Sequence, residues 1–283
     1  MANLNTLIED IYNTIGSISE GKDLDIPEEI AEDFGRRMKE ALLHWSTPKK
    51  QVKGLRMSNI GKPGRQLWYE QRDDQNRNKI SSPVMIKFLY GHLLEEVLLL
   101  FVKLSGHEVT DEQKEIKVEG ITGHMDCKID GEVVDIKTAS GRSFSKFITG
   151  SLAEDDPFGY IAQLCGYEQA EGTDKGGFLA INKETGELAL YTPEELDKIN
   201  IKSRIIKTKK MLEIDNPPAR CYSEEPDGKS GNFKINKNCY YCPYKFECYS
   251  DANEGKGLRT FTYARGPVYL TKVNKLPRVD EVA

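Results

Sequence analysis

Residues 123–138 read GHMDCKIDGEVVDIKT and carry the pattern of a β-hairpin. Asp130-Gly131 separates two runs in which apolar and polar residues alternate. An Asp-Gly pair between alternating runs is the strongest short-range signal for a two-residue β-hairpin turn. With this turn, Ile129 pairs with Glu132, and the hairpin register is set along both strands.

The register places Asp126 directly opposite Asp135, and strand alternation puts Lys137 on the same face as Asp135. Facing residues of an antiparallel pair have Cβ atoms about 4.5–5.5 Å apart, where like charges are destabilising. A divalent cation held by both carboxylates would remove the repulsion, because hard Mg²⁺ and Mn²⁺ prefer oxygen ligands. The alternative is an edge hairpin whose acids point into water beside Lys137 and Lys128.

The rest of the chain surrounds this hairpin with further elements. Periodicity and turn residues predict helices near 4–17, 27–45, 85–104, 158–171 and 193–213, and strands near 113–119, 123–129, 132–139, 177–182 and 187–191. This order predicts an α/β fold in which helices flank a mixed central sheet. Composition changes after Pro218, where the chain becomes rich in Cys and poor in aliphatic residues. The predicted domains are a helical acidic segment (1–57), an α/β core (58–216) and a Cys-rich segment with a basic tail (217–283).

Length and charge limit the class of protein. A chain of 283 residues, 38% of them hydrophobic, can bury a sizeable core. It has no apolar run of about 18 residues, and acids stand where a secretory signal carries bases, so we expect a cytoplasmic protein with no membrane partner. The net charge of −5 argues against DNA at first sight. However, residues 1–35 hold nine acids and one base, a balance of −8, which leaves +3 for residues 36–283.

Two helices carry polar residues of interest. Glu95 and Glu96 interrupt the apolar helix, whose predicted core stripe comprises Leu89, Leu93, Val97, Leu100 and Leu104. A carboxylate in such a helix is either at the solvent edge of the stripe or a buried ligand. Gln163 and Tyr167 are spaced i, i+4 on one helical face, and both side chains can hydrogen-bond a phosphate or a base.

The motifs occur in an order that resembles the PD-(D/E)XK nuclease superfamily: Gly91 with Glu95, then Asp126, then Asp135-Ile136-Lys137, then Gln163-x-x-x-Tyr167. The likeness is closest to the RecB-like exonuclease branch, which includes phage exonucleases and CRISPR-associated RecB-like exonucleases. It covers residues 91–167, and Gln-x-x-x-Tyr favours that branch. A histidine is common there at the position of Glu95, and the glutamate keeps a ligand-capable side chain.

This resemblance implies a restriction-endonuclease-like core and a role for each residue. The implied ligands of one or two Mg²⁺ or Mn²⁺ ions are three carboxylates and one backbone carbonyl, those of Glu95, Asp126, Asp135 and Ile136. Lys137 would orient the attacking water or stabilise the charge that develops on the phosphorus. Gln163 and Tyr167 would position the DNA strand at the scissile phosphate.

The cysteines suggest a second, structural metal. Cys239, Cys242 and Cys248 form a C-x₂-C-x₅-C pattern, with Cys221 upstream. In a chain without a signal peptide such a cluster indicates metal before disulfides, and four thiolates can bind Zn²⁺ or a [4Fe-4S] cluster. The triplet is similar to the iron–sulfur cysteines of the RecB-like exonucleases. In those proteins the fourth cysteine precedes the core, just before an arginine. Residues 58–69 resemble that N-terminal region but have no cysteine before Arg65, so Cys221 must supply the fourth ligand here, and both metals stay open.

The basic tail is a candidate DNA-binding surface. Residues 256–278 hold six bases, no acid, and the aromatic residues Phe261, Tyr263 and Tyr269. Bases alternating with aromatics fit a single-strand track, and an extended basic strand at the surface is the alternative. The candidate DNA-binding residues are Arg65, Gln163, Tyr167, Arg259, Arg265 and Lys272.

Together these observations predict a Mg²⁺- or Mn²⁺-dependent DNA exonuclease acting on DNA ends or single strands. Its expected setting is replication, recombination or DNA degradation in a bacterial cell or a phage-infected host, with replication or recombination proteins as partners. The alternatives are a structure-specific endonuclease and a non-catalytic, metal-stapled nucleic-acid-binding module. The facing carboxylates of Asp126 and Asp135 favour catalysis, because a binding module has no need of them.

Overall fold

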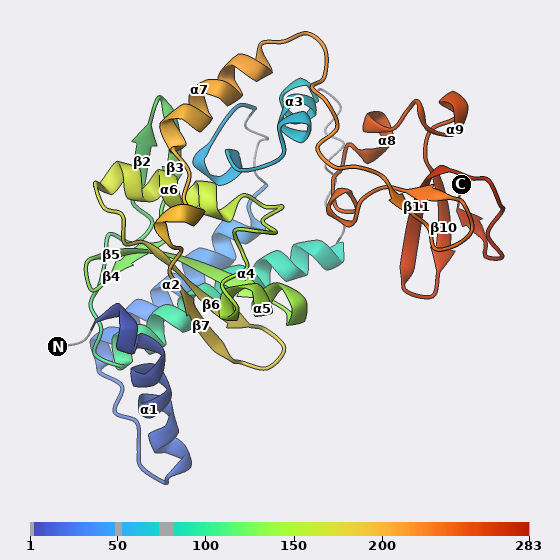
Figure 1. Ribbon diagram of the computed structural model, residues 1–283. Helices are drawn as coiled ribbons and strands as arrows, with labels where there is room; N and C mark the ends of the chain where they lie inside the picture. Colours follow the sequence, from blue (N-terminus) through green and yellow to red (C-terminus); the bar gives the residue numbers. More distant parts are fainter. Residues whose placement is uncertain (1–2, 49–52, 74–81, 283) are drawn as a thin grey trace. The chain divides into compact units, whose positions relative to one another are not determined.

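The computed structural model describes residues 3–48, 53–73 and 82–282 (Figure 1). The chain forms two compact units, one of residues 1–61 and 80–207 and the other of residues 62–79 and 208–283. This division differs from the predicted domains, because the N-terminal helices join the central sheet and residues 62–79 join the Cys-rich segment.

The first unit is mixed α/β. Its helical elements are η1 (Leu4–Thr6), α1 (Leu7–Ser19), α2 (Glu28–Ser46), η2 (Met57–Asn59), α4 (Ser82–Leu104), α5 (Gly141–Ile148), α6 (Tyr160–Glu171), η3 (Glu195–Asp197) and the first part of α7 (Ile201–Leu212). Its strands are β1 (Val109–Thr110), β2 (Glu115–Val118), β3 (Ile121–His124), β4 (Cys127–Ile129), β5 (Glu132–Ala139), β6 (Gly177–Asn182) and β7 (Leu188–Tyr191). The strand predicted near 123–129 is divided: β3 pairs with β2 in a separate hairpin, and only β4 joins β5.

The central sheet has the order β1-β4-β5-β6-β7. Only β5 and β6 are parallel, and the other neighbours are antiparallel. Ile129 pairs with Glu132, which confirms the predicted hairpin register. Asp130 and Gly131 both have positive φ, 51° and 86°, as a two-residue turn of type I′ requires.

Helices cover both faces of this sheet (Figure 1). Val134 and Ile136 of β5 point to a core formed with α1 and α4. Val133 and Ala139 of the same strand point to a core formed with α5, α6, η2 and α7. The alternation is the expected one for a buried strand, and it confirms the predicted mixed α/β sheet flanked by helices.

The acidic N-terminal segment belongs to this unit because its apolar residues are part of the core. Leu7 and Ile11 of α1 are fully buried beneath the sheet. The His107 ring contacts Asp10 of α1 at 3.2 Å and Asp130 of the hairpin turn at 2.6 Å. Removing α1 would therefore expose one face of the central sheet.

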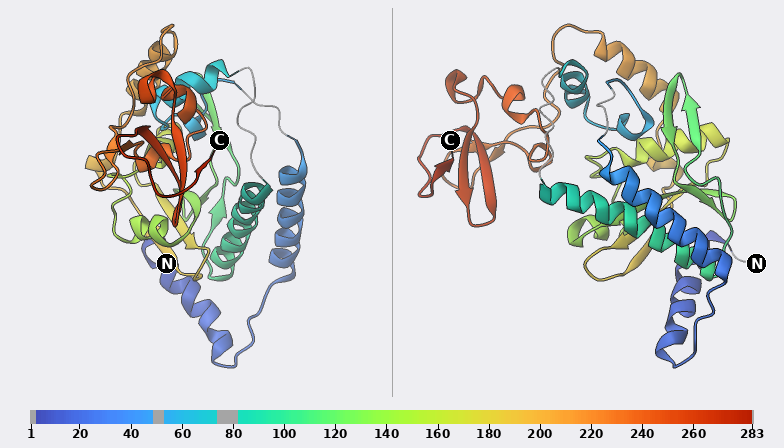
Figure 2. Two further views of the ribbon diagram at one scale, coloured as in Figure 1. Left: turned by 90° about the vertical axis from the view of Figure 1, so that its right-hand side faces the viewer. Right: turned by 180° about the vertical axis from the view of Figure 1, so that it is seen from behind.

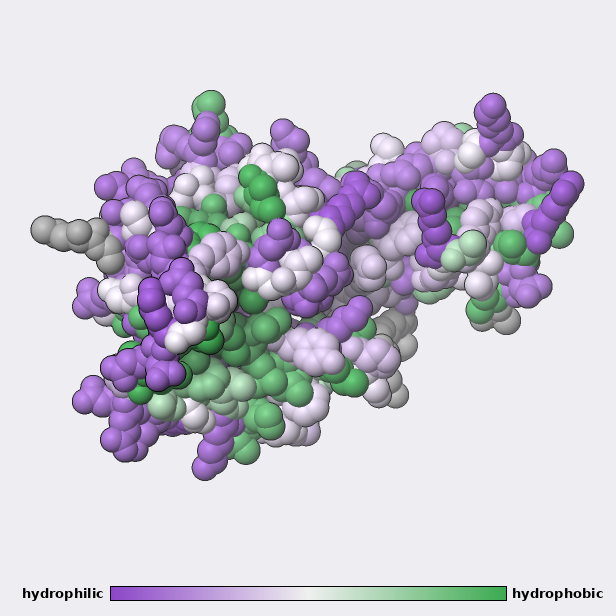
Figure 3. Space-filling model, turned by 90° about the horizontal axis from the view of Figure 1, so that it is seen from below, coloured by the Kyte–Doolittle hydropathy of each residue, from purple (hydrophilic) through white to green (hydrophobic). Residues whose placement is uncertain are grey.

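Helix α2 forms an outer layer. It lies beside α4, as the blue and teal ribbons of Figure 2 show, and none of its described residues is fully buried. Leu42 and Leu43 remain exposed, and the surface seen from below carries apolar areas among hydrophilic ones (Figure 3). No helix among the described residues is long and apolar enough to cross a membrane.

The second unit contains a small antiparallel sheet that the sequence analysis does not predict. The helical elements of this unit are α3 (Gly64–Arg72), η4 (Lys237–Cys239), α8 (Lys245–Cys248) and α9 (Ala252–Gly255). The strands of the sheet are β8 (Glu225–Pro226), β9 (Phe233–Lys234), β10 (Arg259–Tyr263), β11 (Gly266–Lys272) and β12 (Glu281–Val282). They lie in the order β12-β10-β11-β9-β8. Phe261 is buried, and the Tyr263 hydroxyl donates to Asp227. The ring of Phe261 is therefore not available to stack on a base, whereas Tyr263 is half-buried and its part in the predicted single-strand track stays a prediction.

Candidate active site

Asp135 lies in the middle of the central sheet. Its strand β5 pairs with β4 on one side and β6 on the other, and the residue is fully buried. These two facts exclude the alternative of an edge hairpin with acids in water. Lys137 Nζ lies 2.5 Å from Asp135 Oδ2, and Oδ1 accepts no hydrogen bond from any described residue. An unpartnered buried carboxylate oxygen is costly, and it fits a site for a cation.

Asp126 immediately precedes β4, where the ladder with β5 ends. Its Oδ2 accepts a hydrogen bond of 2.7 Å from the backbone N–H of Ile136, so the carboxylate turns toward β5. The last ladder pair is Cys127 with Val134, so the predicted direct pairing of Asp126 with Asp135 is not part of the ladder. Burial, followed by the nearby carboxylates of Asp135 and Glu95, raises the pKa of Asp126 well above its ordinary value. Crowded carboxylates of this kind are stabilised when they share a cation or a proton.

Glu95 faces the same cluster from helix α4. The helix buries Leu98, Leu99 and Val102 rather than the predicted stripe, and Glu95 lies on this buried face at helical spacing. Its Oε1 accepts a hydrogen bond of 2.9 Å from Gln113 Nε2. Burial, then the charges of Glu96 and Asp135, raise the pKa of Glu95 to about 7.

Glu96 has a different environment. Burial raises its pKa, and the nearest charges that act on it are Arg37, Glu112 and Lys103. Those three residues form an ion-pair network, in which Arg37 and Lys103 contact Glu112 at 2.7 and 3.1 Å. Of the two neighbouring glutamates, Glu95 is therefore the one that interacts with Asp126 and Asp135.

Lys137 is held as an ammonium. Burial alone lowers the pKa of a lysine, but the carboxylates of Asp135 and Asp126 outweigh it and raise the pKa of Lys137 above its ordinary value. The Nζ atom also lies 4.6 Å from the centre of the Tyr160 ring, a cation–π distance. The sequence analysis did not single out Tyr160 or Gln113, since neither belongs to a recognisable pattern.

Tyr167 and Gln163 form one hydrogen-bonded unit on α6. The buried Tyr167 hydroxyl donates to the backbone carbonyl of His124 at 2.7 Å and accepts from Gln163 Nε2 at 2.6 Å. Tyr167 is only 1% exposed, so it orients Gln163 and does not itself face solvent. Direct contact of Gln163 with DNA stays a prediction.

As they stand, no three His, Cys, Asp or Glu side chains of the described residues are arranged around a point that a metal ion could occupy. In the catalytic cluster, the oxygens of Asp126, Asp135 and Glu95 are engaged by Ile136, Lys137 and Gln113, respectively. Coordination of one ion by all three carboxylates therefore requires these contacts to rearrange.

Glu95→Gln tests the electrostatics of the cluster. The pKa of Glu95 in the folded protein, about 7, lies above the ordinary value of 4.5. The stability that the protonated Glu95 contributes is therefore fully present below pH 4.5 and is lost as the pH rises through 7. We expect Glu95→Gln in chelator to match wild type at pH 4 and to exceed it by on the order of 3 kcal/mol at pH 8. Mg²⁺ should stabilise wild type more than the variant.

Urea denaturation at both pH values, with and without Mg²⁺, measures these differences. Glu108→Gln is the matched control, because Glu108 is exposed. A Glu95→Gln variant whose stability advantage is the same at pH 4 and pH 8 would contradict the buried, raised-pKa environment of Glu95.

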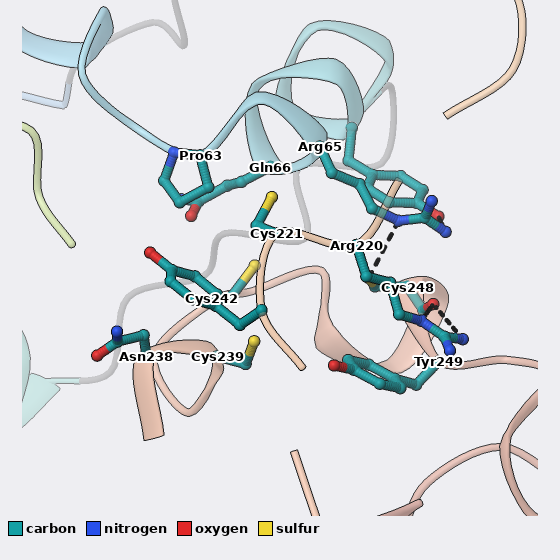
Figure 4. A pocket seen from close by; sticks show the side chains of 12 residues that line it. Pro63, Arg65, Gln66, Arg220, Cys221, Asn238, Cys239, Cys242, Cys248 and Tyr249 are labelled. Carbon is teal, nitrogen blue, oxygen red and sulfur yellow. Dashed lines mark hydrogen bonds between the residues drawn. The ribbon is translucent and has the colours of Figure 1, made fainter. Parts of the chain in front are cut away.

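The four clustered cysteines line one pocket in the second unit. Figure 4 shows the side chains of Cys221, Cys239 and Cys242 directed into it. Burial, then the neighbouring thiols of Cys242 and Cys248, raise the pKa of Cys239 to about 12, and burial raises the pKa of Cys242 to about 11. Thiolates are the ligands that Zn²⁺ and iron–sulfur clusters prefer, but as they stand no three of these described cysteines surround a point that a metal ion could occupy, so the structural metal stays a prediction.

Arg65 belongs to this pocket. Its Nε donates to Cys248 Sγ at 3.1 Å (Figure 4). Its other nitrogens donate to the Pro218 carbonyl and, at 3.4 Å, to the Tyr69 hydroxyl. The guanidinium predicted to bind DNA is thus used within the second unit.

The other basic residues predicted to bind DNA lie on the small sheet of the second unit. Arg259 forms a two-pronged ion pair with Glu281, at 2.8 and 2.6 Å. Arg265 and Lys272 are exposed, and their contact with DNA stays a prediction.

The known proteins with a similar fold share little sequence identity with this chain. No protein-family model matches the sequence, and no curated protein is significantly similar to it. Similar solved structures include that of SSO0001, with 19% identity, a TM-score of 0.42 and coverage of 76% of this chain and 94% of that chain. Another is an alkaline exonuclease (LHK-Exo) from Laribacter hongkongensis, with 14% identity, a TM-score of 0.36 and coverage of 55% and 89%. LHK-Exo in complex with dAMP has 14% identity, a TM-score of 0.30 and coverage of 56% and 92%. These likenesses concern the course of the backbone alone.

Proposed function

We propose that this chain is a metal-dependent deoxyribonuclease of the RecB-like exonuclease kind, which hydrolyses phosphodiester bonds at DNA ends or in single strands. One observation carries the proposal. The fully buried Asp135 has an unpartnered oxygen and lies beside the ammonium of Lys137 and the carboxylates of Asp126 and Glu95. Perturbed groups gathered around one point are typical of a catalytic site.

The donor set fits a hard divalent cation. Carboxylate oxygens from Asp126, Asp135 and Glu95, with the carbonyl of Ile136, are the ligands that Mg²⁺ or Mn²⁺ prefers. The unpartnered Oδ1 of Asp135 supports this assignment. A bound cation would polarise a phosphoryl oxygen and lower the pKa of a water molecule.

The remaining residues supply charge and position. The ammonium of Lys137, held between Asp135 and the Tyr160 ring, would stabilise negative charge that develops on the phosphate. The amide of Gln163 is partly exposed and oriented by Tyr167, so it can donate a hydrogen bond to the DNA strand. Positioning by groups whose own rotamers are fixed lowers the entropic cost of reaching the transition state.

A non-catalytic binding module accounts less well for the cluster. Burying several carboxylates with one lysine costs stability unless the charges are compensated, and a module that only binds DNA gains nothing from that cost. A structure-specific endonuclease would use the same chemistry as an exonuclease but would act on a different DNA substrate. A comparison of linear with closed circular DNA therefore distinguishes the two.

Purified protein incubated with end-labelled linear DNA and with closed circular DNA, in Mg²⁺, Mn²⁺ or chelator, tests the proposal. We expect linear or single-stranded DNA to be degraded from its ends in the presence of metal and circles to stay intact. Cutting of circles as well would indicate an endonuclease. No cutting of either substrate with either metal would contradict the nuclease proposal.

We further propose that the cysteine pocket binds Zn²⁺ or a [4Fe-4S] cluster that stabilises the second unit. Metal analysis and the visible spectrum separate the two, since an iron–sulfur cluster absorbs broadly and zinc does not absorb. We expect Cys239→Ser to lower the metal content and the melting temperature of this unit, since metal binding is coupled to folding. Cys165→Ser, in the first unit, is the control. A Cys239→Ser variant that retains full metal content would contradict the assignment.

A further inference from the structure

The loop that enters helix α6 is held rigidly. The Asp156 carboxylate accepts hydrogen bonds from the backbone N–H groups of Gly159, Tyr160 and Ile161, at 2.8, 3.0 and 2.9 Å. Gly159 has φ of 79° and its backbone touches Gly61, where an added Cβ would lie 2.3 Å from the Gly159 Cα. The two residues between Asp156 and Gly159, Pro157 and Phe158, are therefore held at both ends of a short segment.

Phe158 is the large side chain that this loop exposes. It is 53% exposed, and its ring stacks on Tyr160 with a centroid distance of 5.5 Å and an interplanar angle of 24°. Tyr160 in turn lies 4.6 Å from the Nζ of Lys137. Packing of the core does not require an exposed phenyl ring here, and an exposed aromatic on a fixed loop is a common feature of binding sites.

The geometry points to Phe158 as a stacking site for the nucleobase next to the scissile phosphate, an inference that rests on the proposed nuclease function. The first N–H groups of α6 are occupied by Asp156, so this helix end is not available to a phosphate. The phosphate would meet Lys137, and the exposed face of Phe158 would take the base. Stacking on an aromatic ring tolerates any base, as a nuclease without sequence preference requires.

A base-deletion experiment tests this assignment. We expect Phe158→Ala to lower kcat/KM on a linear oligonucleotide by roughly 5- to 100-fold, the usual range for loss of one stacked base. Wild type should lose a similar factor when one of the three terminal nucleotides is abasic. Phe158→Ala should lose nothing further on that abasic substrate, and Phe158→Trp should retain wild-type activity. Ile148→Ala removes an exposed apolar side chain of α5 in the same unit. This control should have the wild-type kcat/KM on both the intact and the abasic oligonucleotide.

A second measurement does not depend on cleavage. With chelator present, the fluorescence of an oligonucleotide carrying terminal 2-aminopurine should be quenched by wild type and Phe158→Trp but not by Phe158→Ala. If wild type cuts nothing yet quenches in this way, the proposed function fails and the stacking site stands. If Phe158→Ala quenches and cuts like wild type, or loses the same factor on intact and abasic DNA, the stacking site is wrong. Should Phe158→Ala unfold, Phe158→Leu removes the ring and keeps an apolar contact with Tyr160.

Discussion

Asp135→Asn is expected to lower the rate of DNA cleavage by at least about a hundredfold, the effect of removing one charged group that stabilises a transition state. The substitution keeps the shape of the side chain in β5 but removes the charge that pairs with Lys137 at 2.5 Å. It also removes a hard anionic ligand, so binding of Mg²⁺ should weaken. Because Lys137 loses the buried carboxylate that it pairs with, the folded protein should also lose stability in chelator.

Single-turnover cleavage of end-labelled DNA measures the rate, and the Mg²⁺-dependent rise in melting temperature measures the metal. Asp174→Asn is the matched control, since Asp174 is exposed in the turn before β6. Equal cleavage by Asp135→Asn and wild type, with both proteins folded, would contradict the proposed site. Loss of cleavage together with a changed fold would require the same comparison on Lys137→Met.

Gly61→Ala is expected to destabilise the first unit by about 3 kcal/mol or more, at the upper end of the range for overpacking. An added Cβ at Gly61 would lie 2.3 Å from the Gly159 Cα and 2.4 Å from its carbonyl oxygen. Both atoms are backbone, so no side chain can move aside. The Asp156 hydrogen bonds that hold Gly159 oppose a shift of that loop, and the clash must displace one segment from the core.

Urea denaturation followed by Trp45 fluorescence measures this effect. Trp45 lies in the first unit and Trp68 in the second, so a Trp68→Phe background reports on the first unit alone. Gly16→Ala in α1 is the control. Nothing lies within 4 Å of its added Cβ, and replacing a glycine inside a helix stabilises by about 0.5–1 kcal/mol. A Gly61→Ala variant as stable as wild type would show that the two backbones are not in close contact.

The hairpin and the common face of Asp135 and Lys137 follow from the sequence alone. Asp130-Gly131 selects its turn through local backbone geometry, and strand alternation then determines every face of β5. The pairing of Ile129 with Glu132 confirms this. Strand β6 is predicted with its observed bounds, because a short apolar run between turn residues has few other solutions.

Helix α4 shows why part of the site was not predictable. It is apolar almost all round, so its periodicity does not distinguish the face that carries Leu98 and Val102 from the predicted stripe. The choice depends on packing against α1 and the sheet. That packing also decides that Glu95, and not Glu96, interacts with Asp135.

Contacts between distant segments were decided only by the tertiary structure. Gly61 against Gly159 and Arg65 on Cys248 have no local sequence signal. The sequence alone determined the strand register and the residue types available for chemistry, because both depend on neighbours along the chain. Which of those residues share a buried environment depends on how apolar faces pack, since burial and mutual charge, and not spacing, determine their pKa values.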